Sequence, residues 1–332
     1  MYFLVVLTFR TPFLSLRGTG SRSNLIALFS SLLFVSHPIQ TEAVTYIFQR
    51  LASLCAFFYL LSLVFYIKWR LGVKEKSPSP VIARGDSPEA ISGIATPSAR
   101  NDRGEIDKKI ITALLLYLGS LLSAILAMKT KENAFTLPVV IMLYEFFFFK
   151  GSLGKRILYL IPFLLTMLII PFSLIGIDKP VGEIISGVEP ATRGYGEISR
   201  QDYLFTQFRV ITTYIRLLFL PINQNIGYDY PVYHSFFEVQ VFLSFLFLLS
   251  IFGFAVYLYV RSKSSPISRL IAFGVFWFFI TLSVESSIIP LPMWINEYRV
   301  YLPSVGALVA VTSSIFILVE KIKNRNIRAP VQ

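Results

Sequence analysis

The chain has 332 residues, of which 55% are hydrophobic and 15% are charged, and its mean hydropathy is +0.65. Average soluble domains are less apolar and carry more charge, so this composition excludes an ordinary soluble domain and indicates an all-α polytopic membrane protein. The net charge of +12 is not gathered in a basic patch interleaved with aromatic residues, which argues against a nucleic-acid partner. The single cysteine, Cys55, lies in an apolar stretch, which excludes a disulfide framework and a thiolate metal site.

The N-terminal residues 1–9 are apolar but lack a basic region and a small-residue cleavage site. We therefore expect the end of a helix rather than a cleaved signal peptide. Three arginines then surround a turn rich in Gly, Ser and Thr, and a short apolar stretch leads from Leu25 to Ser36.

A polar run, HPIQTEAVTYIFQR from His37 to Arg50, comes next and enters an apolar stretch. Pro38 suits the first position of a helix, where its missing N–H loses no intrahelical bond. Ionisable groups at membrane depth are costly and mark functional sites by default, although long side chains at an interface also snorkel to water. On one continuous helix a single face would carry Glu42, Tyr46, Gln49 and Ser53, with Thr45 and Arg50 beside it.

About eight apolar stretches are predicted to cross the membrane as helices. A further stretch, Leu204–Leu220, has the length of a span but contains Gln207, Arg209 and Arg216, so we expect a re-entrant or interfacial helix there. The predicted spans are Leu25–Ser36, Val44–Ile67, Ile110–Met128, Ala134–Phe149, Ile157–Gly176, Val239–Val260, Arg269–Val284 and Val305–Val319.

The spans are expected to form one membrane domain over residues 1–332, with three notable polar segments. Residues 72–106 combine prolines with Ser, Gly and charge, which predicts a disordered cytoplasmic loop. Residues 177–238 are expected to be an extracytoplasmic loop that carries the re-entrant or interfacial helix. Residues 320–332 are expected to be a basic cytoplasmic tail.

The positive-inside rule gives this arrangement an orientation. Alternating spans place most of the 31 Lys and Arg residues in loops on one side, which we expect to be cytoplasmic. A full crossing by Leu204–Leu220 would move the basic segment RSKSSPISR to the other side and break this pattern. Four polar groups then share the extracytoplasmic face: His37 and Glu42; Lys129, Lys131 and Glu132; Arg209, Arg216, Asp229 and His234; and Glu297, Arg299 and Tyr301.

Carboxylates beside Lys and Arg at the mouth of a helix bundle suit a lipid-phosphate substrate. Cations hold the phosphate, while a carboxylate holds a divalent ion such as Mg²⁺ or Mn²⁺, or accepts a proton from an acceptor hydroxyl. No HExxH, P-loop, GxSxG or GxGxxG pattern indicates another enzyme class. Plainer explanations also fit: a helix-end pair of Lys129 with Glu132, a structural pair of Glu297 with Arg299, an aromatic belt at Tyr228 and Tyr230, and a loop role for His234.

Four motifs in order carry a resemblance to a known family: HPIQTEAVTYIFQR, KTKEN at 129–133, LFLP at 218–221 followed by Tyr228-Asp229-Tyr230, and EYRVYLPSVG at 297–306. Together they resemble the membrane domain of the transmembrane and tetratricopeptide-repeat O-mannosyltransferases and their bacterial relatives. The resemblance covers nearly the whole chain. It begins downstream of the first extracytoplasmic loop, where these enzymes carry an acidic motif, so we expect the N-terminal spans to be missing. Family members usually continue into tetratricopeptide repeats, and residues 1–332 contain none.

The resemblance implies a GT-C-like helix bundle and transfer of a sugar, mannose in the best-known members, from a polyprenyl-phosphate donor to a protein hydroxyl. It implies a multi-pass protein of the plasma (inner) membrane with its active face extracytoplasmic. Glu42, which could also bind a divalent cation, and Glu297 are the expected catalytic residues. The expected substrate-binding residues are His37, Gln49, Arg50, Lys129, Lys131, Glu132, Arg209, Arg216, Asp229, Arg299 and Tyr301.

Two other functions remain open. A homologue without chemistry could keep the donor pocket as a binding or scaffold module. A transporter of lipid-linked substrates should show an internal repeat and polar lining in both halves of the membrane. Here the polarity gathers at one face, so the glycosyltransferase hypothesis leads, with membrane lipid, a lipid-linked sugar and an acceptor protein as partners.

Overall fold

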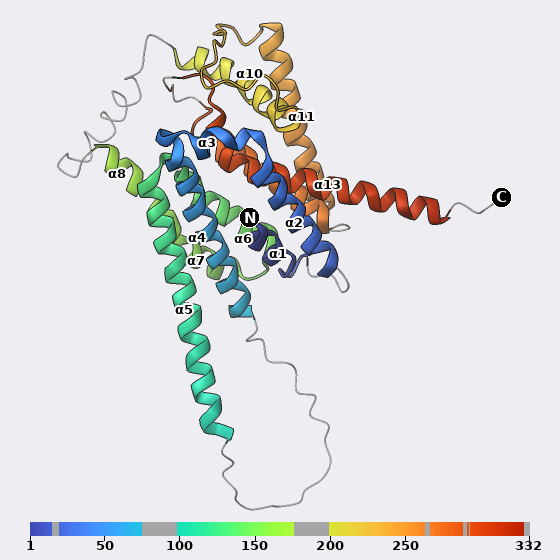
Figure 1. Cartoon of the computed structure of the whole chain (residues 1–332). Coiled ribbons are helices and arrows are strands. Elements are labelled where there is room, and N and C mark those ends of the chain that lie inside the picture. Colours follow the sequence, from blue (N-terminus) through green and yellow to red (C-terminus); the bar gives the residue numbers. More distant parts are fainter. Residues whose placement is uncertain are drawn as a thin grey trace, which may run out of the picture.

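The computed structural model describes residues 1–14, 20–74, 98–175, 199–262, 266–287, 291 and 293–328. In these ranges the regular elements are all helices, which confirms the predicted all-α class (Figure 1). The α-helices are α1 (Tyr2–Phe9), α2 (Gly20–Ser36), α3 (Thr41–Thr45), α4 (Arg50–Lys74), α5 (Ser98–Thr130), α6 (Leu137–Phe148), α7 (Leu153–Thr166), α8 (Ile169–Ile175), α10 (Arg200–Phe219), α11 (Val239–Arg261), α12 (Pro266–Leu282) and α13 (Tyr301–Arg328).

Five helices of the described ranges are long and apolar enough to cross a membrane. Two shorter apolar helices, Ser23–Ser36 and Ile267–Leu282, match two further predicted spans. Length and composition thus make the chain a helical protein with five candidate membrane spans, as expected of a multi-pass membrane protein. These spans are Ile47–Val73, Lys108–Thr130, Leu153–Ser173, Val239–Arg261 and Glu297–Lys323.

The predicted span Ala134–Phe149 has a different structure. It consists of a 3-10 turn, η3 (Glu132–Thr136), and the 12-residue helix α6. Twelve residues rise roughly 18 Å, well short of the ~30 Å thickness of a bilayer's hydrocarbon core. Tyr144 and Phe148 on α6 are fully buried, so this helix packs in the core of the bundle.

Three predicted boundaries also shift. The span predicted at Ile157–Gly176 is divided into α7 and α8 by a turn. Helix α13 continues to Arg328, so most of the predicted basic tail is helical. Helices α4 and α5 extend into both ends of the predicted loop 72–106, and its central part, 75–97, lies outside the described residues.

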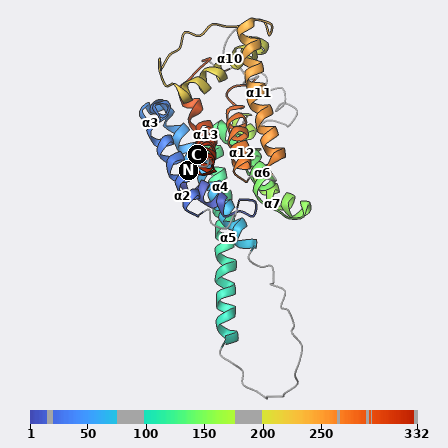
Figure 2. The same cartoon turned by 90° about the vertical axis from the view of Figure 1, so that its right-hand side faces the viewer.

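Helix α10 corresponds to the stretch predicted to be re-entrant or interfacial, and it is not one of the candidate spans. The Ser199 hydroxyl accepts a hydrogen bond of 3.0 Å from the Asp202 N–H and so caps its first turn. Figures 1 and 2 show α10 lying across one end of the bundle, beyond α3 and beside α11. Whether this helix is re-entrant or interfacial stays a prediction.

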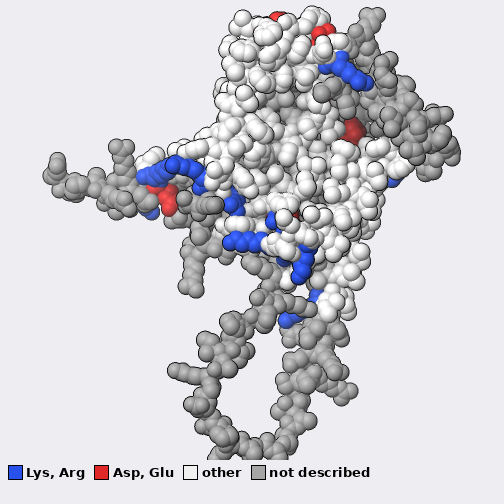
Figure 3. Space-filling view, turned by 180° about the vertical axis from the view of Figure 1, so that it is seen from behind, with Lys and Arg blue, Asp and Glu red and all other residues white. Residues whose placement is uncertain are grey.

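Charged residues are distributed unevenly along the bundle. Figure 3 shows that, on the face seen from behind, Lys and Arg gather mainly toward the end opposite α10. This agrees with the grouping of basic loops on one side of the predicted topology.

The polar run His37–Arg50 does not form the continuous helix that the sequence predicted. Pro38 does begin a helical turn, the 3-10 turn η1 (Pro38–Gln40), and α3 follows. Tyr46 then takes an extended conformation, with φ −79° and ψ 117°, before the 3-10 turn η2 (Ile47–Gln49) and α4. The predicted polar face of Glu42, Tyr46, Gln49 and Ser53 is therefore wrong. Val44, Thr45 and Ile47 are β-branched and lose rotamer freedom in a helix, which favours a break at this point.

The end of the bundle opposite α10 is held by one buried carboxylate, Glu145 on α6. Its side chain is 0% exposed and accepts hydrogen bonds from Tyr66 (3.0 Å) and from Arg70 Nη2 (3.0 Å). Arg156 Nε lies 3.4 Å from the same carboxylate. Helix α6 also ends here, and arginines donate to its exposed carbonyls: Arg156 to Glu145 O, and Arg269 to Phe147 O. Helices α4, α7 and α12 are thus tied to the C-terminus of α6.

Helices α12 and α13 approach each other closely at a pair of glycines. A Cβ atom added to Gly306 would lie 2.5 Å from Gly274 O and 2.6 Å from Trp277 Cβ, much closer than atoms can pack. Trp277 Nε1 donates to Leu302 O at 2.9 Å beside the crossing. Small residues at such crossings let membrane helices pack backbone to backbone.

We predict that Gly306→Ala destabilises the protein by about 1–3 kcal/mol, because the new methyl group forces α12 and α13 apart. Gly253→Ala is the matched control: Gly253 also lies within a long apolar helix, and nothing approaches its would-be Cβ within 4 Å. Thermal unfolding in detergent should show a lower midpoint for Gly306→Ala alone. Equal midpoints for the two variants would contradict the close crossing.

We predict a larger loss, about 3–5 kcal/mol, for Glu145→Gln, because it leaves two buried arginines without a counter-charge. Glu132→Gln, the same substitution at an exposed carboxylate, should lower the unfolding midpoint far less. A Glu145→Gln variant as stable as the parent would show that the ion pairs contribute nothing to the fold.

Candidate functional site

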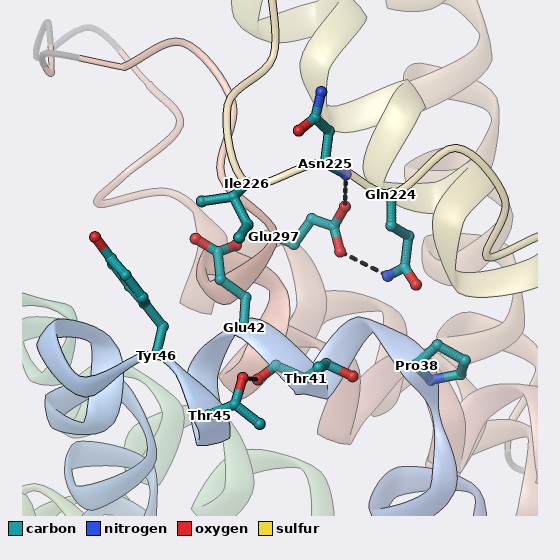
Figure 4. Close-up of a pocket in the computed structure, with 9 residues that line it drawn as sticks. All are labelled: Pro38, Thr41, Glu42, Thr45, Tyr46, Gln224, Asn225, Ile226 and Glu297. Carbon is teal, nitrogen blue, oxygen red and sulfur yellow. Dashed lines mark hydrogen bonds between the residues drawn. The ribbon is translucent and has the colours of Figure 1, made fainter.

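A pocket of about 270 Å³ lies at the end of the bundle where α3 meets the segment that follows α10. One wall comes from η1 and α3, the opposite wall from residues 224–226, and the floor from the 3-10 turn η4 (Glu297–Val300). Figure 4 shows the side chains of Glu42, Glu297 and Ile226 directed toward the space between these elements, while the Asn225 amide points away from it. The pocket is lined by Pro38, Thr41, Glu42, Thr45, Tyr46, Gln224, Asn225, Ile226 and Glu297.

Glu42 is half-buried in this pocket, and the short helix α3 directs its side chain toward η4. Its Oε2 accepts a hydrogen bond of 3.0 Å from the Tyr298 N–H. Burial raises the pKa of the Glu42 carboxyl above its ordinary value, and the nearby Glu297 carboxylate adds to the rise, while the Tyr298 N–H opposes it. A carboxylate with a raised pKa is better able to accept a proton near neutral pH.

Glu297, by contrast, is buried and fully engaged by hydrogen-bond donors. Its Oε2 accepts from Gln224 Nε2 at 2.6 Å, and its Oε1 accepts from the Asn225 N–H at 3.1 Å. The Tyr228 hydroxyl also donates to Oε1. Burial and the Glu297 carboxylate raise the pKa of this hydroxyl, so Tyr228 remains a donor at neutral pH.

A buried ion pair lies directly behind Glu42. Lys131 Nζ is 2.6 Å from Glu285 Oε1 and lies 4.4 Å from the centre of the Tyr298 ring. Burial lowers the pKa of the Lys131 ammonium, but the Glu285 carboxylate, together with Tyr298 and Glu132, raises it by more, so Lys131 stays charged. Tyr298 therefore binds Glu42 through its backbone and covers Lys131 with its ring.

Three other predicted residues have structural contacts near the pocket. His37 Nδ1 accepts from the Ile39 N–H at 3.2 Å, so Nε2 carries the proton and donates to Leu218 O at 3.1 Å. Arg299 is 2% exposed and donates to Met293 O at 2.8 Å and to Trp294 O at 3.3 Å. Tyr301 packs its ring edge-on against Phe34.

The remaining predicted binding residues do not line this pocket. Lys129 Nζ donates to Ser173 at 3.0 Å, and Arg209 donates to Ser244 on α11 at 3.4 Å. Arg216 lies near enough to Tyr228 to oppose the rise in its pKa electrostatically. Of the predicted site residues, only Glu42 and Glu297 line the pocket, and Lys131, Arg299 and His37 lie close to its elements. The other predicted residues outside the lining are Gln49, Arg50, Lys129, Glu132, Arg209, Arg216, Asp229 and Tyr301.

Sequence reasoning gave no role to Gln224 and Ile226 in the pocket wall, or to Tyr298 and Glu285 behind it. The run Asn223-Gln224-Asn225 after Pro221 was a visible signal, because amides rarely cluster beside an apolar helix without a polar partner. Within the described ranges the pocket lining contains no Lys or Arg, and no group of three or more His, Cys, Asp or Glu side chains could hold a metal ion.

No protein-family model, no curated protein and no solved structure matches this chain. The pocket and the residues around it are therefore the basis for a functional proposal.

We predict that Glu42→Gln stabilises the protein at neutral pH, because the raised pKa means that folding disfavours the ionised form. The glutamine keeps an oxygen that accepts from the Tyr298 N–H. The gain should shrink as the pH falls through the raised pKa toward the ordinary value of 4.5, where the parent carboxyl is protonated in both states.

Thermal unfolding near pH 7.5 and pH 5 in the same detergent measures this difference. Glu42→Ala is the control, because it removes the acceptor of the Tyr298 N–H and should lower the unfolding midpoint at both pH values. A Glu42→Gln variant that is less stable than the parent at neutral pH would contradict the prediction.

Proposed function

We propose that the chain is the membrane domain of a glycosyltransferase that transfers a mannose-like sugar from a polyprenyl-phosphate donor to a protein hydroxyl. One observation carries the proposal: motifs far apart in the sequence, on which the resemblance rests, converge on one pocket. HPIQTEAVTYIFQR supplies one wall and EYRVYLPSVG supplies Glu297. Residues 224–226, between LFLP and Tyr228-Asp229-Tyr230, supply the other wall. KTKEN contributes Lys131, which lies against Tyr298.

Glu42 is the proposed general base. One of its oxygens is held by the Tyr298 N–H, and Figure 4 shows the carboxylate directed into the space between Tyr46 and Glu297. In the proposed step Glu42 accepts the proton of the acceptor hydroxyl, whose oxygen bonds to the anomeric carbon of the sugar. The bond from that carbon to the phosphate oxygen breaks, and its electron pair leaves with the polyprenyl phosphate.

The donor's phosphate needs a cation and its polyprenyl chain needs an apolar surface. Residues in and near the pocket can supply both. Arg216 is exposed near Tyr228 and is the proposed contact for the phosphate. Ile226 in the pocket lining is 66% exposed, and Ile47 and Phe48, which directly follow the lining residue Tyr46 in the sequence, are 73% and 80% exposed. They suit the polyprenyl chain within the bilayer.

The described residues do not fit a bound divalent cation such as Mg²⁺ or Mn²⁺: no group of three or more His, Cys, Asp or Glu side chains could hold one, and the oxygens of Glu297 already accept three hydrogen bonds. Glu42 is the remaining carboxylate of the lining, and a carboxylate bound to a cation could not also accept the proton. The proposed setting is a plasma (inner) membrane, with about eight spans in a GT-C-like bundle and the pocket on the extracytoplasmic side.

A donor-binding module without catalysis is the second candidate. The observation that favours it is the charge of the site: in the described ranges, the pocket lining has two carboxylates and no cation. Lys131 is paired with Glu285, and Arg299 is bonded to backbone carbonyls. Such a module would bind the donor without transferring its sugar.

The experiment is a transfer assay with the purified chain in nanodiscs, using radiolabelled polyprenyl-phosphate mannose and a peptide rich in Ser and Thr. We predict that Glu42→Gln lowers the transfer rate at least ~100-fold, the usual contribution of a general base. Glu320→Gln, which changes a carboxylate toward the C-terminal end of α13, away from the pocket, should keep the parent rate.

Equal transfer by the parent and Glu42→Gln would exclude Glu42 as the base. Saturable donor binding by the parent without any transfer would support the donor-binding module instead. If the parent neither binds the donor nor transfers its sugar, both functions are excluded for this donor.

A further inference from the structure

Residues 223–229, which follow α10 and precede Tyr230, form one wall of the pocket and have no regular secondary structure. We call this segment the strap. Its residues Gln224, Asn225 and Ile226 face Glu42 and Thr45 across the cavity (Figure 4). The position of the strap therefore decides how far Glu42 is open to its surroundings.

The hydrogen bonds that join the strap to the rest of the molecule end at a single side chain, and Tyr228 also packs its ring against the buried apolar cluster that includes Val210 and Tyr214. Within the described ranges, its hydrogen bonds to residues outside the segment all end on Glu297: those from Gln224 Nε2, from the Asn225 N–H and from the Tyr228 hydroxyl. Its other hydrogen bonds are internal, such as that from the Gly227 N–H to Asn225 Oδ1.

Two positions in the strap have features expected of hinges. Asn223 has a φ of 58°, in the left-handed region, where the backbone turns sharply. Gly227 has nothing within 4 Å of its would-be Cβ, so the chain has free space beside it. Beyond the strap, the Tyr230 hydroxyl is 3.0 Å from Thr213 Oγ1, which anchors the following residues to α10.

We infer that Glu297 is a positioning residue, and that the strap which it holds closes over the substrate's hydroxyl groups beside Glu42. The amide of Gln224 and the hydroxyls of Thr41 and Thr45 are the neutral groups of the lining that recognise hydroxyls. The absence of Lys and Arg from the described pocket lining also favours the uncharged part of a substrate there. Release of the Glu297 contacts opens the wall, and their formation closes it.

This inference rests on the proposed function for the identity of the substrate, but the motion of the strap does not. It can be measured without any reaction, by electron paramagnetic resonance distances between two spin labels. One label is placed at Gly227→Cys, where the side chain has room, and the other at Val260→Cys, which is 69% exposed near the end of α11. Cys55→Ser, which removes the buried native thiol, is the common background.

The parent should show one narrow distance distribution, with an open population below about 10%. Glu297→Gln should make a second distance the major population, because the glutamine NH₂ cannot accept from the donors of the strap. The double variant Gln224→Ala/Tyr228→Phe removes two of the three donors, leaves Glu297 in place, and should do the same. Glu320→Gln is the matched control and should keep the narrow distribution.

A narrow, parent-like distribution in both the Glu297→Gln and the double variant would overturn the inference. Gel filtration and the thermal midpoint check that each variant is folded. If Glu297→Gln does not fold, the double variant decides the question by itself.

The transfer assay separates positioning from catalysis. The double variant should raise KM for the donor with a smaller effect on kcat, whereas Glu42→Gln should lower kcat. If the parent transfers no sugar, the proposed function fails, while the distance measurement still decides whether Glu297 holds the strap. If transfer occurs but the strap variants keep parental distances and parental KM, the positioning role fails alone.

Discussion

The fold depends most on the carboxylate of Glu145. A charge with no exposure is stable only when its oxygens are paired, and here a tyrosine and two arginines from α4 and α7 supply the partners. Each partner can meet Glu145 in only one register of the helices. One of these arginines, Arg156, also donates to the Glu145 carbonyl near the end of α6, and Arg269 of α12 donates to the Phe147 carbonyl. The buried carboxylate and the neighbouring carbonyls together set how α4, α6, α7 and α12 meet at one end of the bundle, while the pocket lies at the other end.

The pocket end of the bundle also contains buried charged groups, but here not every charge is paired with an opposite one. Lys131 and Glu285 neutralise each other, and Glu297 is held by neutral donors, so the charge of Glu42 has the fewest partners in the pocket. The glycine crossing of α12 and α13 brings η4 to this place, because η4 leads directly into α13. Packing in the apolar core and the chemistry of the pocket are therefore linked through the first turn of one helix.

Much of the helical framework could be predicted from hydropathy alone, since long apolar stretches must form helices in a membrane. The separate character of α10 was also visible, in the polar and charged residues within an apolar stretch. The break at Tyr46 was harder to predict: the β-branched residues around it weaken a helix but do not fix where it ends, and the Tyr298 N–H that binds Glu42 on α3 is distant in the sequence. Charge pairing was equally hidden: Lys131 has Glu132 as its neighbour in sequence, yet it pairs with Glu285, 154 residues away. The sequence could predict that these polar residues lie at one end of the bundle. It could not predict which of them pair with each other, because that depends on the fold.

The extended conformation of Tyr46 separates the short helix α3 from the long helix α4. Spanning helices adjust to the thickness of the bilayer mainly by tilting. A rigid helix running through Tyr46 would turn every such tilt into a sideways displacement of the Glu42 carboxylate, magnified by its distance from the pivot. With a joint at Tyr46, α4 can tilt while α3 keeps its place against η4. The geometry around Glu42 is thereby insulated from variation in lipid composition.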